Sequence, residues 1–298
     1  MKHGEETNVE GLKNGPNRRP PEGTSPAQVG KPRSDSAAGV ALAVMGAVRA
    51  IPLQLRLSSR YETAVLPIRD NIPSSRFPAI TLGLIVVNLL FFLWELSLGK
   101  RLERAFIELA IIPVRYSDPD IAQFFSFREQ VVPFFSSMFL HGGWLHLIGN
   151  MWTLWIFGDN VEDRLGHAKY LLLYLASGIA AALLHIYTNL NSQLPTIGAS
   201  GAVAGVMGAY FRFYPHARVE TIIPPFFLGP YFVLPAVLFL GWWFFLQFFN
   251  GALSLGTGVK GFGGVAWWAH VGGFAFGVVV CLLARRKARR YVDDDESG

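Results

Sequence analysis

Six apolar segments occupy most of this chain and constrain its fold more than any other feature. Most of them approach the roughly 20 apolar residues that a helix needs to cross a bilayer. The chain is 51% hydrophobic and only 16% charged, whereas charged residues make up about a quarter of an ordinary soluble domain. The segments are 78–98, 144–157, 170–187, 199–213, 231–249 and 264–284. The sequence therefore predicts an all-α membrane protein, a bundle of six transmembrane helices.

Basic residues predict the orientation of this bundle, because Lys and Arg collect on the cytoplasmic side of a membrane. They flank alternate connections between the segments. The flanking basic residues are Arg56, Arg60, Arg69, Arg76, Arg164, Lys169, Arg212, Arg218 and the cluster in 285–290. We therefore expect both termini in the cytoplasm. The connection 99–143 also carries basic residues, on the outer side, but long loops follow this rule poorly. The formal net charge of +5 is explained by topology, so no nucleic-acid partner is expected.

The two ends of the chain differ in composition from the apolar middle. Residues 1–36 are rich in Gly, Pro and polar residues and are expected to be disordered. Residues 37–60 fit an amphipathic segment on the membrane surface or a plain linker equally well, and a seventh spanning helix less well. The predicted organisation is an N-terminal extension, 1–60, a six-helix membrane domain, 61–290, and an acidic tail, 291–298.

Polar side chains stand near the starts of the second, fourth and sixth segments. Ser200 opens the fourth segment, His270 lies inside the sixth, and His146 and Asn150 lie in the first turns of the second. In a six-crossing chain with a cytoplasmic N-terminus, these three segments all begin on the outer face. The four side chains are therefore expected at one depth. Ionisable groups inside a membrane are expensive, so they are candidates for function.

The residue types fit nucleophilic catalysis. A neutral His270 can take the proton of Ser200 and later give it to a leaving amine. His146 and Asn150 are four residues apart, hence on one helix face, and both can donate hydrogen bonds to a developing oxyanion. Because no acidic residue is placed to orient the imidazole, we predict a Ser–His dyad without a third, acidic member.

Glycines in the fourth and sixth segments allow the dyad to form. Small residues at four-residue spacing let membrane helices approach closely, and a Ser–His hydrogen bond requires such an approach. The glycines are Gly201, Gly205 and Gly208 in the fourth segment, and Gly273 and Gly277 in the sixth. We expect these two helices to pack against each other.

Three motifs closely resemble those of the rhomboid family of intramembrane serine proteases. They are the run from His141 to Asn150 (HGGWLHLIGN), the run from Gly198 to Gly201 (GASG), and the run from Ala269 to Gly277 (AHVGGFAFG). The stretches 67–70 and 157–164 also look like bacterial members. The likeness runs from about residue 65 to 285 in the same motif order.

The resemblance implies a six-helix bundle with Ser200 as nucleophile and His270 as base. It also implies that His146, Asn150 and the Ser200 backbone amide stabilise the oxyanion, and that His141 is a structural residue of the first outer loop. Two positions depart from some members. Some members carry a Trp-Arg pair in that loop, and the nearest positions in this chain are Val132 and Pro133. Some carry an aromatic residue four residues after the serine, and this chain has Ala204 there.

The predicted function is therefore an intramembrane serine endopeptidase that cuts in or near transmembrane segments toward the outer face. Its partners would be transmembrane substrates and the lipid bilayer, and no cofactor or metal ion is expected. A small residue should precede the cut, and Gly or Pro should weaken the substrate helix beyond it. The resemblance to bacterial members implies a multi-pass protein of the inner, cytoplasmic cell membrane.

Three other functions are compatible with parts of this pattern. His146 and His270 could be the axial ligands of a b-type haem. Small residues and broken helices also line the paths of transporters and channels, although no internal repeat is visible. The third alternative is a relative of the family that binds membrane partners without cutting them. The joint occurrence of Ser200, His270, His146 and Asn150 favours the protease.

Overall fold

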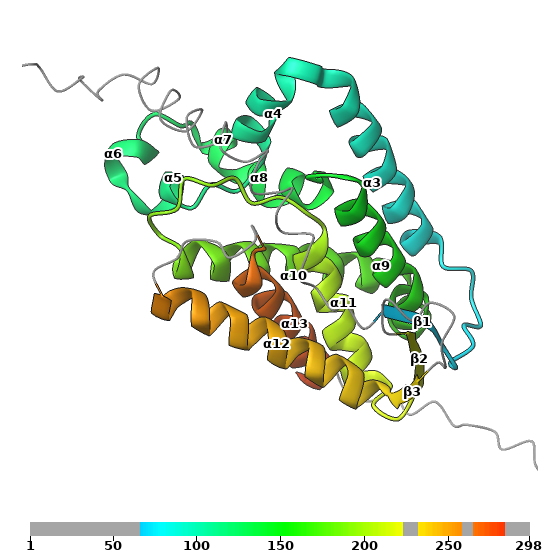
Figure 1. Ribbon diagram of the computed structural model, residues 1–298. Helices are drawn as coiled ribbons and strands as arrows, with labels where there is room; N and C mark the ends of the chain where they lie inside the picture. Colours follow the sequence, from blue (N-terminus) through cyan, green and yellow to red (C-terminus); the bar gives the residue numbers. More distant parts are fainter. Residues whose placement is uncertain (1–65, 223–231, 258–264, 284–298) are drawn as a thin grey trace, which may run out of the picture.

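A computed structural model describes residues 66–222, 232–257 and 265–283 of the chain, and six long helices dominate these residues (Figure 1). Each of the six apolar segments corresponds to one of them, and α9 extends beyond its predicted end. The helices are α3 (Ala79–Leu98), α9 (Trp144–Leu165), α10 (His167–Thr188), α11 (Ser200–Phe213), α12 (Ala236–Thr257) and α13 (Trp267–Leu283).

Three helical stretches in the described residues are long and apolar enough to cross a membrane by length and composition. They are Ala79–Leu109, His167–Thr188 and Ala236–Leu255. A fourth span is possible if the helices before and after a 79° bend, Phe127–Phe139 and Trp144–Leu165, count as one. A predominantly helical protein with three or four candidate spans is therefore confirmed, while six crossings and the orientation of the termini stay predictions.

The short helix α11 lies at the centre of the bundle and packs against α9, α10, α12 and α13 (Figure 1). Every residue from Gly201 to Tyr210 is buried, as expected for a helix that is apolar on all sides. Its 14 residues make a helix of about 21 Å at 1.5 Å per residue, shorter than the roughly 30 Å hydrocarbon core of a bilayer. Ser200, at its start, therefore lies within the bundle.

The connection between α3 and α9 folds into short helical pieces. They are η1 (Gly99–Arg101), α4 (Leu102–Leu109), α5 (Val114–Ser117), α6 (Pro119–Ala122), α7 (Phe127–Val131), α8 (Pro133–Ser136) and η2 (Ser137–Phe139). Arg115 is buried among them and donates hydrogen bonds to the carbonyl oxygens of Ile107 and Glu129, at 2.8 and 3.0 Å. Its guanidinium also lies 3.9 Å from the ring centre of Phe125. One buried arginine thus ties three parts of this connection together.

A small antiparallel sheet corrects the prediction of an all-α fold. Its strands are β1 (Leu66–Asp70), β2 (Arg218–Ile222) and β3 (Phe232–Pro235), in the order β1-β2-β3. The strands are too short for a period-two pattern to stand out in the sequence. The sheet forms at the end of the bundle where α9 and α11 finish (Figure 1), and the Trp152 indole donates to the carbonyl of Pro67 at 2.7 Å.

Polar side chains fasten this sheet to the helices. Asp70 of β1 accepts hydrogen bonds from Asn160 of α9, at 2.8 Å, and from the hydroxyl of Tyr210 of α11. Burial raises the pKa of Asp70 to about 6. The predicted N-terminal extension, 1–60, and the predicted acidic tail, 291–298, lie outside the described residues.

Candidate active site

Ser200 and His270 meet at the starts of two neighbouring helices. Ser200 is the first residue of α11, and His270 lies in the first turn of α13. The Oγ atom of Ser200 is 2.8 Å from Nε2 of His270. This distance lies within the range expected for a nucleophile and its general base. The structure therefore brings together the two side chains that the sequence placed at one depth.

Glycines set the distance between α11 and α13. A Cβ atom at Gly273 would lie 2.9 Å from the carbonyl carbon of Gly201, and one at Gly277 would lie 2.8 Å from that of Gly205. Both distances are closer than real Cβ atoms approach backbone, so any side chain at either position would force the helices apart. The expected packing of these two helices is present, and it holds the serine and the histidine within hydrogen-bond reach.

Gly198 shapes the turn that leads into Ser200. Its φ of 127° lies in a region that residues with a side chain rarely adopt. A Cβ atom there would also come within 2.6 Å of Nε2 of His146. Its backbone N–H donates to the carbonyl of Ser137 at 2.9 Å, which anchors the turn. The imidazole of His146 therefore packs directly against the backbone beside Ser200.

Asn150 is connected to this site through His141. Its side-chain nitrogen lies 3.1 Å from Nε2 of His141, and the rings of His141 and His146 meet edge to face with centres 5.2 Å apart. The backbone N–H of His141 donates to the Glu95 carboxylate, at 3.0 Å to one oxygen. An asparagine amide has two N–H groups, so the contact with His141 leaves one for another acceptor.

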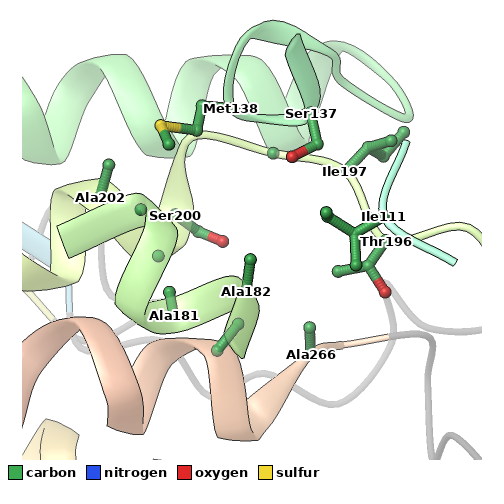
Figure 2. A pocket seen from close by; sticks show the side chains of 14 residues that line it. Ile111, Ser137, Met138, Ala181, Ala182, Thr196, Ile197, Ser200, Ala202 and Ala266 are labelled. Carbon is green, nitrogen blue, oxygen red and sulfur yellow. The ribbon is translucent and has the colours of Figure 1, made fainter. Parts of the chain in front are cut away.

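A small pocket of about 30 Å³ opens beside Ser200 (Figure 2). Its walls come from α10, α11, the start of α13, and the segments that carry Ile111, Met138 and Thr196. Many lining residues are Gly or Ala, including Ala182 and Ala266. The pocket therefore has room for a small apolar group near the serine hydroxyl.

Sequence reasoning missed Gln247, although one signal pointed to it. Gln247 of α12 is buried, and its Oε1 atom lies 2.7 Å from Nδ1 of His270. It is a single amide within an otherwise apolar segment, and such polar groups call for a partner. Ala204, four residues after Ser200, is fully buried, and the indole of Trp243 lies near the imidazole of His270, with ring centres 5.8 Å apart.

His185 of α10 bonds through Nε2 with the hydroxyl of Thr196 at 2.8 Å, so its polar atom has a structural partner. Within the described ranges, no group of three or more His, Cys, Asp or Glu side chains is arranged to hold a metal ion.

A comparison with protein-family models matches residues 128–287, more than half of the chain, to the rhomboid domain. All four predicted site residues and Gln247 fall within this range. The match also includes the glycines of α11 and α13, so the elements that form the site are those of the domain.

Curated relatives match shorter parts of the chain. "Rhomboid protein 1, mitochondrial" of Saccharomyces cerevisiae is 36% identical over 93 residues, which are 30% of this chain and 27% of the relative. "Presenilin-associated rhomboid-like protein A, mitochondrial" of Danio rerio is 29% identical over 146 residues, 45% and 37% of the two chains. "RHOMBOID-like protein 5" of Arabidopsis thaliana is 38% identical over 74 residues, which are 25% of this chain and 24% of the relative. The matches thus span well under half the length of these relatives.

These relatives correct one expectation from the sequence. The bacterial resemblance led us to place the protein in the inner, cytoplasmic cell membrane. The yeast and zebrafish relatives are mitochondrial by name, as is that of Bos taurus, and these names contradict that location. The bacterial resemblance came from two short stretches, 67–70 and 157–164, and such stretches do not identify a compartment.

Proposed function

Since the chain belongs to the rhomboid family, we propose that it is an intramembrane serine endopeptidase that hydrolyses peptide bonds in or near transmembrane segments of membrane proteins. The observation that carries this proposal is the contact of 2.8 Å between Ser200 Oγ and His270 Nε2. It lies inside a helical bundle and beside a small pocket. A nucleophile in contact with a base needs only a substrate carbonyl and an oxyanion site for acyl transfer.

In the proposed reaction, Ser200 attacks the carbonyl carbon of the scissile bond while His270 takes the hydroxyl proton. His270 then gives this proton to the leaving amine as the C–N bond breaks. Water attacks the remaining ester, with His270 again as base, and releases the second product and free Ser200. The histidine therefore ends each cycle neutral and ready to accept a proton.

The negative charge that develops on the carbonyl oxygen needs hydrogen-bond donors. We assign this role to His146, Asn150 and the backbone N–H of Ser200. The position of His146 against the turn at Gly198 supports the assignment. So does the place of Ser200 as the first residue of α11, because the first N–H groups of a helix have no partner within it.

The pocket supports a preference for a small residue before the cut. Its many alanine and glycine residues and its volume of about 30 Å³ suit a methyl-sized side chain better than an aromatic ring (Figure 2). A substrate helix hides its carbonyl groups in hydrogen bonds and must unwind to reach Ser200. Gly or Pro near the cut lowers that cost, by about 1 kcal/mol for Gly and about 3 kcal/mol for Pro relative to Ala.

The topology that we propose is six crossings with both termini in the cytoplasm and a membrane domain at 61–290. In this arrangement, α9, α11 and α13 all begin on the outer side, so the cut falls near the outer face. The charge pattern of the connections supports the orientation. The shortness of α11 supports a nucleophile that lies below the membrane surface.

The proposal is tested by incubating the purified protein with a panel of labelled single-span membrane proteins. We expect cleavage by the wild type after a small residue near the outer face, with product ends mapped by mass spectrometry. Ser200→Ala should slow cleavage by about 10⁴-fold or more, as in other serine proteases. Ser254→Ala is the matched control, because that hydroxyl on α12 donates to a carbonyl of its own helix, that of Gly251.

Two outcomes would contradict the proposal. Undiminished cleavage by pure Ser200→Ala protein would rule out this serine as nucleophile. A folded wild type that binds single-span proteins but cuts none of them would favour the alternative of a non-cutting relative.

A further inference from the structure

Gln247 is a buried amide on a helix in which two other polar side chains bond to the helix's own backbone. Its side chain belongs to α12, and the residue is 7% exposed. Asn250 and Ser254 of the same helix donate to carbonyls one turn earlier, those of Leu246 and Gly251. Burying an amide is unfavourable unless it forms hydrogen bonds. The position of Gln247 therefore requires a partner outside its helix.

That partner is His270. Oε1 of Gln247 lies 2.7 Å from Nδ1 of the imidazole, and on the other side of the ring Nε2 lies 2.8 Å from Ser200 Oγ. An amide oxygen only accepts hydrogen bonds, so Nδ1 must carry the proton in this contact. In a neutral imidazole the other nitrogen is then a free acceptor. The amide thus selects the one tautomer in which His270 can take the proton of Ser200.

The aromatic side chains around the imidazole of His270 do not fix which way its two nitrogens point, so the contact with Gln247 must do so. The indole of Trp243 lies against one side, with ring centres 5.8 Å apart and an angle of 31°. The indole of Trp267 approaches edge on, at 6.4 Å and 87°. Rings restrict the plane of an imidazole, but they do not distinguish its two nitrogens. Only a directional hydrogen bond does so.

We propose that Gln247 is the third member of this site, a neutral positioning residue that fixes the tautomer and rotation of His270. This inference rests on the proposed function, and it agrees with the expectation of a Ser–His dyad without a third, acidic member, because Gln247 carries no charge. Because Gln247 sits on α12 while His270 sits on α13, the base is in its active tautomer only while these two helices remain packed. The position of α12 therefore controls whether the site can react.

The test compares three variants in the full-length protein. Gln247→Met keeps the length of the side chain and adds no polar group, but it removes the acceptor for Nδ1–H of His270. We expect kcat to fall about 10- to 100-fold, the effect of a displaced catalytic group, with KM within about twofold. Gln247→Glu restores an acceptor and should recover most of the lost kcat. Asn250→Met is the matched control on α12 and should keep the kcat of the wild type.

A spectroscopic measurement covers the case in which Gln247→Met fails to fold. The ¹⁵N chemical shifts of His270 in the wild type report which ring nitrogen carries the proton. We expect protonation at Nδ1. Protonation at Nε2 in the resting protein, or wild-type kcat in folded Gln247→Met, would overturn the inference. Equal loss in the Met and Glu variants would also overturn it, because only a structural role would then remain.

Failure of this inference is distinguishable from failure of the proposed function. If the wild type shows no cleavage that depends on Ser200, the proposed function fails. If cleavage depends on Ser200 while Gln247→Met retains full kcat, only the positioning role of Gln247 fails.

Discussion

The two ends of the helical bundle both carry buried or half-buried polar side chains, but they use them differently. At the end formed by the starts of α9, α11 and α13, the polar groups of Ser200, His270 and Asn150 have one side-chain partner or two, and a pocket adjoins them. At the sheet end, single carboxylates accept several hydrogen bonds. The carboxylates of the sheet end fasten structural elements to one another, whereas at the other end Asn150 keeps one amide N–H for another acceptor and Ser200 lies beside the pocket.

Glu162 of α9 is the clearest example at the sheet end. It is 2% exposed and accepts from the backbone N–H groups of Ile80 and Thr81, at 2.9 and 2.8 Å, and from the Thr81 hydroxyl at 2.7 Å. It also contacts His167 at 2.5 Å. The first N–H groups of α3 have no partner within their own helix, so a carboxylate from α9 caps α3. This contact fixes one helix to another and leaves nothing for a substrate.

Apart from the loss of the dyad itself, the largest effect is expected at the end of the bundle that carries Ser200. His146→Ala or Asn150→Ala should lower kcat by about 10²- to 10³-fold, the usual effect of losing one oxyanion donor. Ser200 should still react with an activated serine reagent, because the dyad is intact. Thermal denaturation checks that the fold is retained. Unchanged kcat in both folded variants would show that these side chains do not stabilise the oxyanion.

An intermediate effect is expected from the contact that links the two helices of the dyad. Gly277→Ala should separate α11 from α13 and reduce cleavage by about 10²-fold, the effect of a displacement of about 1 Å at a reacting group. Overpacking should also lower stability by about 1–3 kcal/mol. The measurement is kcat together with the denaturation midpoint.

Gly83→Ala on α3 is the control for this glycine, since a Cβ atom there would meet nothing within 4 Å. It should leave cleavage unchanged and stabilise the helix slightly. If Gly277→Ala behaves like Gly83→Ala, close packing of α11 and α13 is not what positions the dyad.

The smallest effect on catalysis is expected at the sheet end. Glu162→Gln replaces one acceptor with a donor that faces other donors, which costs about 1–3 kcal/mol of stability for an unsatisfied buried group. The kcat of the folded protein should stay within about twofold of the wild type. A loss of kcat comparable to that of His146→Ala, without loss of stability, would erase the distinction between the two ends.

The sequence predicted the long helices and the site more completely than the parts that connect them. Long apolar runs define α3, α10 and α12, and the spacing of glycines predicted the contact between α11 and α13. Ser200 and His270 could be predicted to lie at one depth because alternate helices start on the same side. These features depend on patterns that repeat along one segment, so they are visible without the fold.

Other features depend on partners far apart in the chain. The sheet joins β1 to β2, about 150 residues later, and neither strand is long enough to show its own period. The caps of α3 come from Glu162, and the orientation of His270 comes from Gln247. A lone glutamine in an apolar segment showed that a partner was needed, but not which one. Only the packed structure identifies it.

The most direct test of the central claim, that Ser200 and His270 act as one catalytic unit, is a comparison of single-turnover cleavage rates. The variants are Ser200→Ala, His270→Ala and the double variant, each checked for its fold. Residues that act as a unit lose nearly all activity when either is removed, so all three rates should be equally low. Losses that multiply in the double variant, or cleavage that persists in Ser200→Ala, would contradict the account.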